Sequence, residues 1–89
     1  MKNKKEIINV SDEQCFWFCN GSVARNLEDL KNALLEMDKK SFIYHVNKEK
    51  NDFAIWVKEI LGDDVLANKL KKSKTIKTII KAIENNLKK

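Results

Sequence analysis

Beyond residue 26, apolar residues recur at intervals of three and four, which is the spacing of one face of a helix. Five segments show this pattern, and each follows a residue of the type that caps a helix N-terminus. The expected N-caps are Asn26, Asp38, Asn51 or Asp52, Asp63 or Asp64, and Ser73. Gly62 is expected to end the third helix, because glycine readily adopts the left-handed conformation just past a helix. The pattern therefore predicts four or five short helices.

The last of these segments has the most regular pattern. Its apolar row consists of Ile76, Ile79, Ile80, Ile83 and Leu87. Lysines occupy the opposite side of the expected helix. Burying five such side chains would contribute about 8–15 kcal/mol before the entropy cost, at roughly 1.5–3 kcal/mol each. We therefore expect this helix to pack against the body of the domain with its lysines facing water.

A short hairpin is expected before the helices. Residues 15–19 form the run Cys-Phe-Trp-Phe-Cys, whose composition favours a β-strand. Asn20-Gly21 follows and predicts a two-residue type I′ turn, because both central residues of that turn need positive φ angles. Residues 22–25 would then be the return strand.

Side chains alternate between the two faces of a strand, so this hairpin should have two different faces. One face would carry Phe16 and Phe18, and the other Cys15, Trp17 and Cys19. A two-stranded ribbon is unstable alone, so one face must lie on the helices. We expect the two phenylalanines to point inward and Trp17 to be at least partly exposed.

These elements predict a mainly α fold, with four or five short helices in a compact bundle and a small N-terminal β-hairpin. Residues 1–12 are expected to form an N-terminal arm and residues 13–89 a single helical domain. Of the 89 residues 43% are hydrophobic, with two glycines and no proline, which excludes a disordered chain. No apolar run approaches the ~18 residues that a membrane-spanning helix needs.

The N-terminus and the cysteines predict the compartment. Only three apolar residues follow the basic start of the chain, whereas a secretory signal needs an apolar stretch of ~7–15 residues. Cys15 and Cys19 would lie ~13 Å apart along a strand, and a disulfide needs Cα atoms within ~7 Å. We expect reduced thiols and a cytoplasmic location.

Charge is unevenly distributed along the chain. The net charge of +5 divides into +1 for residues 1–27, −3 for residues 28–64 and +7 for residues 65–89. A basic surface of this kind can attract nucleic acid or anionic lipid. Seventeen of the eighteen basic residues are lysine, however, and abundant Lys, Asn and Ile are also expected of an A/T-rich coding sequence. Both explanations of the basic C-terminal third stay open.

Few residues offer catalytic or metal-binding chemistry. A nucleophile–base pair needs a histidine near a serine or cysteine, and the single histidine, His45, is far from both cysteines in sequence. A structural zinc site needs four ligands, which two cysteines and one histidine do not supply. Only two glycines occur in the chain, and they do not form a glycine-rich phosphate-binding loop. We predict no catalytic residues, no metal, no cofactor and no small-molecule substrate.

A polar cluster lies between the second and third expected helices. Its members are His45, Asn47, Asn51 and Asp52. We interpret the cluster as structural, with Asn51 or Asp52 as a helix cap and His45 bonded to a neighbouring backbone carbonyl so that it fixes the turn. The alternative is a small polar pocket that recognises a partner's peptide or carboxylate. A structural role predicts that His45→Ala lowers the melting temperature without changing binding per folded molecule.

Several features between residues 16 and 70 occur together in a known family. They are an aromatic strand ended by Asn20-Gly21, the pattern Asn26-Leu27-x-x-Leu30, and the string Tyr-His-Val-Asn-x-x-Lys-Asn-Asp-Phe-Ala-x-Trp that starts at residue 44. The chain thus resembles an uncharacterised archaeal family of small domains of unknown function. It departs at Ile55, where the family has Asn before the tryptophan. The resemblance implies an archaeal, cytoplasmic accessory domain and supplies no chemistry.

We expect a non-enzymatic protein-interaction domain, in which a partner protein or a second copy docks on the hairpin face of Cys15, Trp17 and Cys19. The alternative is sequence-tolerant nucleic-acid binding through a lysine-rich face. That face consists of Lys69, Lys71, Lys72, Lys74, Lys77, Lys81 and Lys88. Membrane docking is disfavoured, because the apolar side of the last helix is expected to lie in the core.

Overall fold

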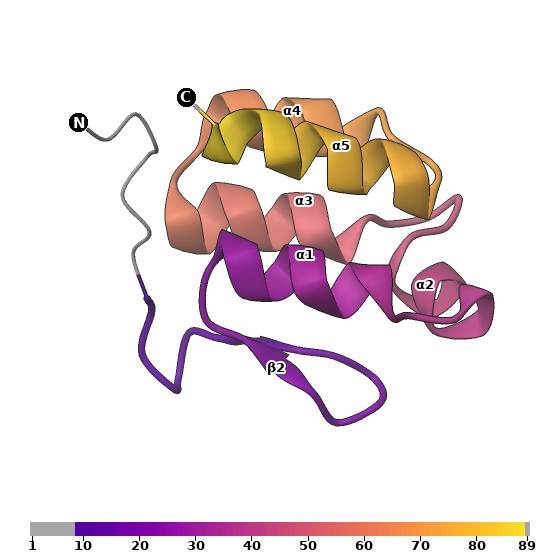
Figure 1. The fold of residues 1–89 in the computed structure, drawn as a ribbon, viewed down its shortest axis with the longest axis horizontal. Coiled ribbons are helices and arrows are strands. Elements are labelled where there is room, and N and C mark those ends of the chain that lie inside the picture. Colours follow the sequence, from indigo (N-terminus) through magenta and orange to yellow (C-terminus); the bar gives the residue numbers. More distant parts are fainter. Residues whose placement is uncertain (1–8, 89) are drawn as a thin grey trace.

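A computed structural model describes residues 9–88, which form a two-stranded antiparallel hairpin and five α-helices (Figure 1). The elements are β1 (Phe16–Trp17), β2 (Val23–Ala24), α1 (Leu27–Leu35), α2 (Lys39–His45), α3 (Asp52–Trp56), α4 (Asp64–Lys71) and α5 (Ile76–Leu87). A π-helix, η1 (Val57–Leu61), continues α3 without a break. The predicted fold class, a mainly α bundle with an N-terminal hairpin, is confirmed.

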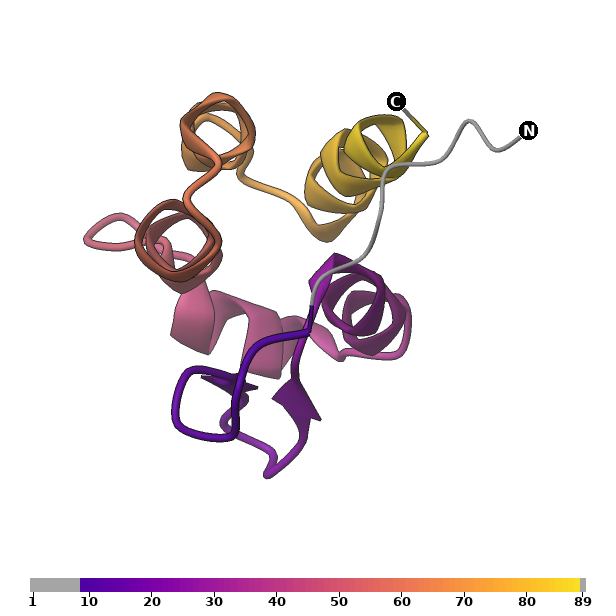
Figure 2. The same ribbon diagram turned by 90° about the vertical axis from the view of Figure 1, so that its left-hand side faces the viewer.

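Four helical segments run alongside one another around a common interior. Figure 2 shows α1, α3 with η1, α4 and α5 nearly end-on. The first of these packs against α5, α3 packs against α4, and α4 also contacts α5. The hairpin lies below α1 in Figure 1, and α2 crosses one end of the bundle. Residues with almost no exposed surface fill the interior: Leu30, Leu34, Phe53, Val57, Leu66, Leu70, Ile79 and Ile83.

The apolar row of the last helix faces this interior, as predicted. Ile79 and Ile83 are fully buried, and the other three members of the row are partly buried against the core. The lysines of α5 are exposed on its opposite side. Helix α5 is therefore an integral part of the domain.

Side-chain caps start the first four helices where the sequence predicts them. Asn26, Asp38, Asn51 and Asp63 each accept a hydrogen bond from the backbone N–H three residues later, at 2.7–3.0 Å. The bond from the backbone N–H of Ser41 lowers the pKa of the Asp38 carboxyl, because it favours the charged form. Gly62 ends η1 with a φ of 70°, which is the left-handed conformation expected there.

The start of α5 differs from the prediction. Ser73 is not its cap, because the Ser73 hydroxyl donates to the carbonyl of Lys69 at the end of α4. Thr75 caps α5 instead, and Thr75 and Thr78 form a reciprocal capping box. Both Ser73 and Thr75 are suitable cap residues, so the local sequence alone does not decide between them.

The hairpin turn also differs from the predicted type I′ turn. Phe18 donates its N–H to the Ser22 carbonyl, which leaves a loop of three residues, 19–21. Gly21 has a φ of 95°, whereas no residue other than glycine has a positive φ among those the structure describes. This is the pattern of a three-residue loop that ends in a left-handed glycine. The Asn20 side chain supports it by accepting the N–H of Ser22 at 3.0 Å.

Residues 9–12, which the sequence assigned to an N-terminal arm, contact the body of the domain. Val10 donates its N–H to the Arg25 carbonyl at 2.9 Å, and Asp12 forms an ion pair with Arg25. The rest of the expected arm, residues 1–8, lies outside the described residues, as does residue 89. Within residues 9–88, no helix is both long and apolar enough to cross a membrane.

Candidate functional site

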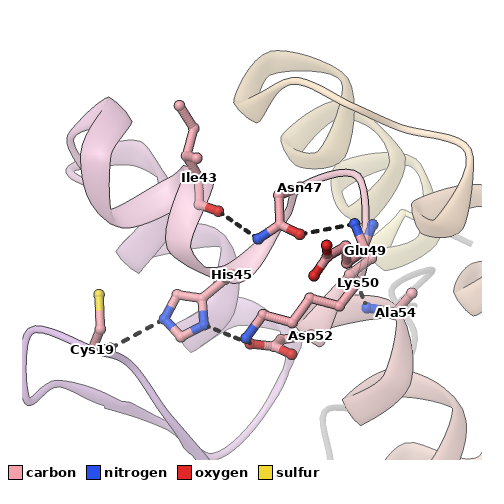
Figure 3. A network of polar contacts seen from close by, with 9 residues as sticks. Cys19, Ile43, His45, Asn47, Glu49, Lys50, Asp52 and Ala54 are labelled. Carbon is pink, nitrogen blue, oxygen red and sulfur yellow. Dashed lines mark hydrogen bonds and ion pairs between the residues drawn. The ribbon is translucent and has the colours of Figure 1, made fainter.

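His45 connects the hairpin to the helices. It is the last residue of α2 and only 3% exposed. Its Nε2 accepts the backbone N–H of Cys19 at 3.1 Å, and its Nδ1 lies 3.0 Å from Oδ2 of Asp52 (Figure 3). Because Nε2 is an acceptor, the ring proton is on Nδ1, which donates to the carboxylate. One imidazole thus links the loop of the hairpin to the first turn of α3.

Aromatic rings surround the imidazole. Its centroid lies 5.2 Å from that of Phe16, 6.0 Å from that of Phe18 and 5.4 Å from that of Phe53. The two hairpin phenylalanines therefore point inward, as predicted. The prediction that His45 bonds a neighbouring backbone carbonyl is wrong, because its partners are the Asp52 carboxylate and a backbone amide 26 residues away in sequence. That contact depends on how the hairpin docks, which the local sequence does not reveal.

Asp52 is shared between two donors. Besides His45, it forms an ion pair with Lys50, whose Nζ lies 3.0 Å from Oδ2. The same ammonium group lies 4.8 Å from the centroid of the Tyr44 ring, which is a cation–π contact. The charge of Asp52 is therefore balanced within the cluster.

The two asparagines of the predicted polar cluster hold backbone segments together. Asn47 donates to the Ile43 carbonyl at 3.0 Å and accepts the N–H of Glu49 at 2.9 Å, so it stabilises the turn after α2. Asn51 caps α3 and also donates to the Leu70 carbonyl near the end of α4, at 2.8 Å. Asp52 therefore is not the cap, and Asn51 joins two helices. This geometry supports the structural interpretation of the cluster.

A pocket of about 310 Å³ lies beside this cluster, between the hairpin and α3. We name it the hairpin–α3 groove. Its lining residues are Cys15, Phe16, Trp17, His45, Asp52, Ile55, Trp56, Glu59 and Ile60. Trp17 and Ile55 contribute large exposed apolar surfaces, with exposed fractions of 66% and 51%. The lining contains two carboxylates and no lysine or arginine.

The hairpin wall of the groove is fixed to the helices at both ends of β1. Trp56 is buried in α3 and donates its indole N–H to the Gln14 carbonyl at 2.8 Å, just before β1. The Cys19 amide is held by His45 just after β1. Trp17 lies between these two attachments, so the strand that carries it is held in place.

The exposed hairpin face is smaller than predicted. Trp17 and Cys19 are exposed, whereas Cys15 is buried and its thiol donates to the Asp12 carbonyl at 3.1 Å. Strand β1 begins at Phe16, after the turn at residues 11–14, so the alternation of faces does not extend back to Cys15. Both cysteines are free, as expected.

Comparison with known proteins places the chain in a family. A model described as "Family of unknown function (DUF5752)" matches residues 6–87, which is nearly the whole chain. The chain belongs to the DUF5752 family. No curated protein and no solved structure matches it. The resemblance to an uncharacterised domain is thereby confirmed, and the archaeal origin that it implied stays a prediction.

In this DUF5752 domain the seven lysines of the predicted basic face are all exposed. They lie on α4, on α5, and next to or between these helices, which pack side by side (Figure 1). This placement agrees with the sequence-based expectation that the lysines face water.

Five residues of the groove lining are not among the predicted site residues: Phe16, Ile55, Trp56, Glu59 and Ile60. Of these, Ile55 and Glu59 are exposed. Ile55 carried a signal in the sequence, because Phe53, Trp56 and Val57 recur at the spacing of one helix face and Ile55 falls outside that face. An isoleucine outside that face is exposed unless another element covers it. Glu59 carried no such signal, since an acidic residue on the polar side of a helix is ordinary.

Cys19 and His45 meet, but not as a nucleophile and a base. The contact is made by the backbone N–H of Cys19, and no hydrogen bond from its thiol to the ring occurs among residues 9–88. The same part of the chain contains no group of three or more His, Cys, Asp or Glu residues that could hold a metal ion.

Proposed function

We propose that this DUF5752 domain is a non-enzymatic protein-interaction domain of the cytoplasm whose partner docks on the hairpin–α3 groove. The observation that carries the proposal is the 66% exposure of Trp17 beside the half-exposed Ile55, on the two walls of one pocket. Tryptophan side chains dominate binding energies at protein interfaces, because they bury a large apolar surface. Clustered exposed apolar side chains commonly mark such interfaces.

Rigidity of the groove supports the same proposal. The Trp56 bond to Gln14 and the His45 bond to Cys19 hold β1 in place before any partner arrives. The hairpin then loses less conformational entropy when a partner binds, so more of the free energy of the apolar contact contributes to affinity. The free cysteines agree with a reducing compartment.

The test is affinity capture from a nuclease-treated extract of the source organism. Wild type is compared with Trp17→Ala and with Val65→Ala, because Val65 is an apolar side chain of α4 that is 63% exposed and does not line the groove. We expect proteins captured by wild type and by Val65→Ala to be lost with Trp17→Ala. The same proteins captured equally by all three chains would contradict the proposal.

A second candidate function is sequence-tolerant nucleic-acid binding through the lysine-rich face. Its support is the exposure of all seven lysines along two adjacent helices. Four or five phosphate contacts would give a salt dependence with a slope of about −4 on duplex DNA. The absence of arginine from these seven positions argues against bidentate reading of bases.

Charge reversal separates the two candidates. Lys77→Glu with Lys81→Glu should abolish binding to a fluorescently labelled DNA duplex, while Trp17→Ala should leave that binding unchanged. Capture of a protein partner should show the opposite dependence. Wild type that does not bind the duplex even at low salt would eliminate this second candidate.

A further inference from the structure

We infer that the hairpin–α3 groove binds a basic peptide segment of a partner protein, with a large apolar side chain in the pocket and a lysine or arginine opposite Glu59. This inference rests on the proposed function, because it names the chemistry of the partner for the same groove. Three features support it: the charge of the lining, the position of Trp17 and the unpaired edge of β1.

The lining of the groove is acidic in a chain whose net charge is +5. The charge of Asp52 is already balanced by Lys50, and its carboxylate also accepts a hydrogen bond from the neutral His45 ring. The Glu59 carboxylate, in contrast, is exposed and forms no ion pair within residues 9–88. A cation from outside is therefore the group complementary to Glu59.

The apolar part of the lining favours a peptide that has a large apolar side chain next to a lysine or arginine. Trp17 and Ile55 expose apolar surface on opposite elements, and the buried Trp56 and the partly buried Ile60 lie beside them. An apolar side chain placed here would be covered from two sides. A lysine or arginine next to it can reach Glu59 or the face of the Trp17 ring, where a cation is also attracted.

The position of the groove relative to β1 favours an extended peptide. Phe16 and Trp17 point to opposite faces of the hairpin, yet both line the pocket, so the pocket lies along the edge of β1. No residue of β2 belongs to the lining, so this is the edge away from β2. Within the described residues no strand pairs with that edge, and the Cys19 N–H just after β1 is already held by His45, so the backbone of a peptide can pair only along the short strand itself.

The experiment selects peptides from a phage-displayed random 12-residue library on the full chain. Enriched sequences are synthesised with a fluorescent label, and their affinity is measured by anisotropy at two salt concentrations. We expect the enriched peptides to share a large apolar or aromatic residue with a lysine or arginine within a few positions. We also expect their affinity to fall as salt is raised.

Variants of the groove then locate the binding. Trp17→Ala should weaken these peptides by about 30-fold or more, as for a central interface residue. Glu59→Lys should weaken them roughly five- to tenfold and flatten the salt dependence, because one attraction becomes a repulsion. The matched controls, Val65→Ala and Glu36→Lys, change exposed residues outside the groove and should leave the affinity unchanged.

The outcomes separate this inference from the proposed function. Enriched peptides without basic residues that still depend on Trp17 would overturn the inference and support the proposed function. Peptides that bind Trp17→Ala as well as wild type would count against both. Failure to enrich any peptide would overturn the inference, as would light scattering that shows a dimer dissociated by Trp17→Ala, since a second copy would then occupy the groove.

Discussion

At the scale of single residues, His45 is the position on which most contacts of the site converge. Its two ring nitrogens bind Cys19 and Asp52, and its ring packs between Phe16 and Phe53. Removing the ring would leave the Cys19 N–H and the Asp52 carboxylate without this partner and open space among aromatic side chains. Each of these losses is destabilising in a buried environment.

We therefore predict that His45→Ala lowers the free energy of unfolding by about 2–4 kcal/mol. His45→Gln should cost less, because its side-chain carbonyl can still accept the N–H of Cys19. Urea denaturation followed by circular dichroism measures both. Equal losses for the two variants would contradict the importance of the bond to Cys19.

Asp38 gives a prediction about pH. Its pKa is lowered in the folded chain by the bond from the Ser41 N–H, so Asp38 stabilises the fold most where the carboxyl is charged in both the folded and unfolded states. That contribution should be lost as the pH falls through the lowered pKa. Asp38→Asn can still cap α2 but carries no charge.

Denaturation curves of wild type and Asp38→Asn across the acidic range test this expectation. The difference in unfolding free energy between them should shrink as the pH decreases below the ordinary aspartate value. A difference that stays constant over the whole range would show that the charge at the cap has no effect.

Residue-level features could be predicted from the sequence where they depend on immediate neighbours. The inward direction of Phe16 and Phe18 and the exposure of Trp17 followed from alternation along a strand. The burial of Cys15 did not, because the strand starts one residue later than the apolar run. The partners of His45 did not either, since they lie 7 and 26 residues away.

At the scale of elements, a helix cap could be predicted where its contacts are local in sequence and could not where a contact with another element decides it. Asn26, Asp38, Asn51 and Asp63 act on N–H groups three residues away, so the local sequence contains the whole interaction. Thr75 rather than Ser73 caps α5, and the Ser73 hydroxyl is bonded to the Lys69 carbonyl of α4 instead. The π-helix η1 had no signal in the spacing of apolar residues.

Asn51 is the cap with an additional role, which gives a prediction for α3. Asn51→Ala removes both the bond to the Ala54 N–H and the bond to the Leu70 carbonyl. We expect it to lower the unfolding free energy by about 1–3 kcal/mol. Asn47→Ala is the matched control, because the bonds of Asn47 are exposed and should contribute at most about 1 kcal/mol.

Thermal and urea denaturation of the two asparagine variants decide this prediction. A similar loss for both would mean that the link between α3 and α4 contributes little. A larger loss for Asn51→Ala, together with faster hydrogen exchange at the end of α4, would support the link.

At the scale of the whole molecule, the packing of α5 against α1 and α4 closes the core. Ile79 and Ile83 are the side chains of α5 that are fully buried in this core. A domain of this size has a total stability of roughly 5–10 kcal/mol, so a few core side chains account for much of it. The sequence predicted that this helix packs against the body of the domain, because its apolar row is too costly to leave in water, but it did not name α1 and α4 as the partners.

Truncation of either isoleucine should therefore be severe. We predict that Ile83→Ala lowers the unfolding free energy by about 2–5 kcal/mol, and that the double variant Ile79→Ala with Ile83→Ala does not fold at room temperature. Val65→Ala, at an exposed position, should change stability by less than about 0.5 kcal/mol. Circular dichroism melting curves of the three variants check these values.

The pairing of α1 with α5 joins helices that are far apart in the sequence. During synthesis α1 leaves the ribosome well before residues 76–87 exist outside it. Until the last helix emerges, the apolar surfaces of Leu30 and Leu34 are not covered by α5 and are exposed to water or to chaperones. The order of translation thus makes completion of this small domain a late event, and a stalled nascent chain that lacks α5 would be a target for quality control.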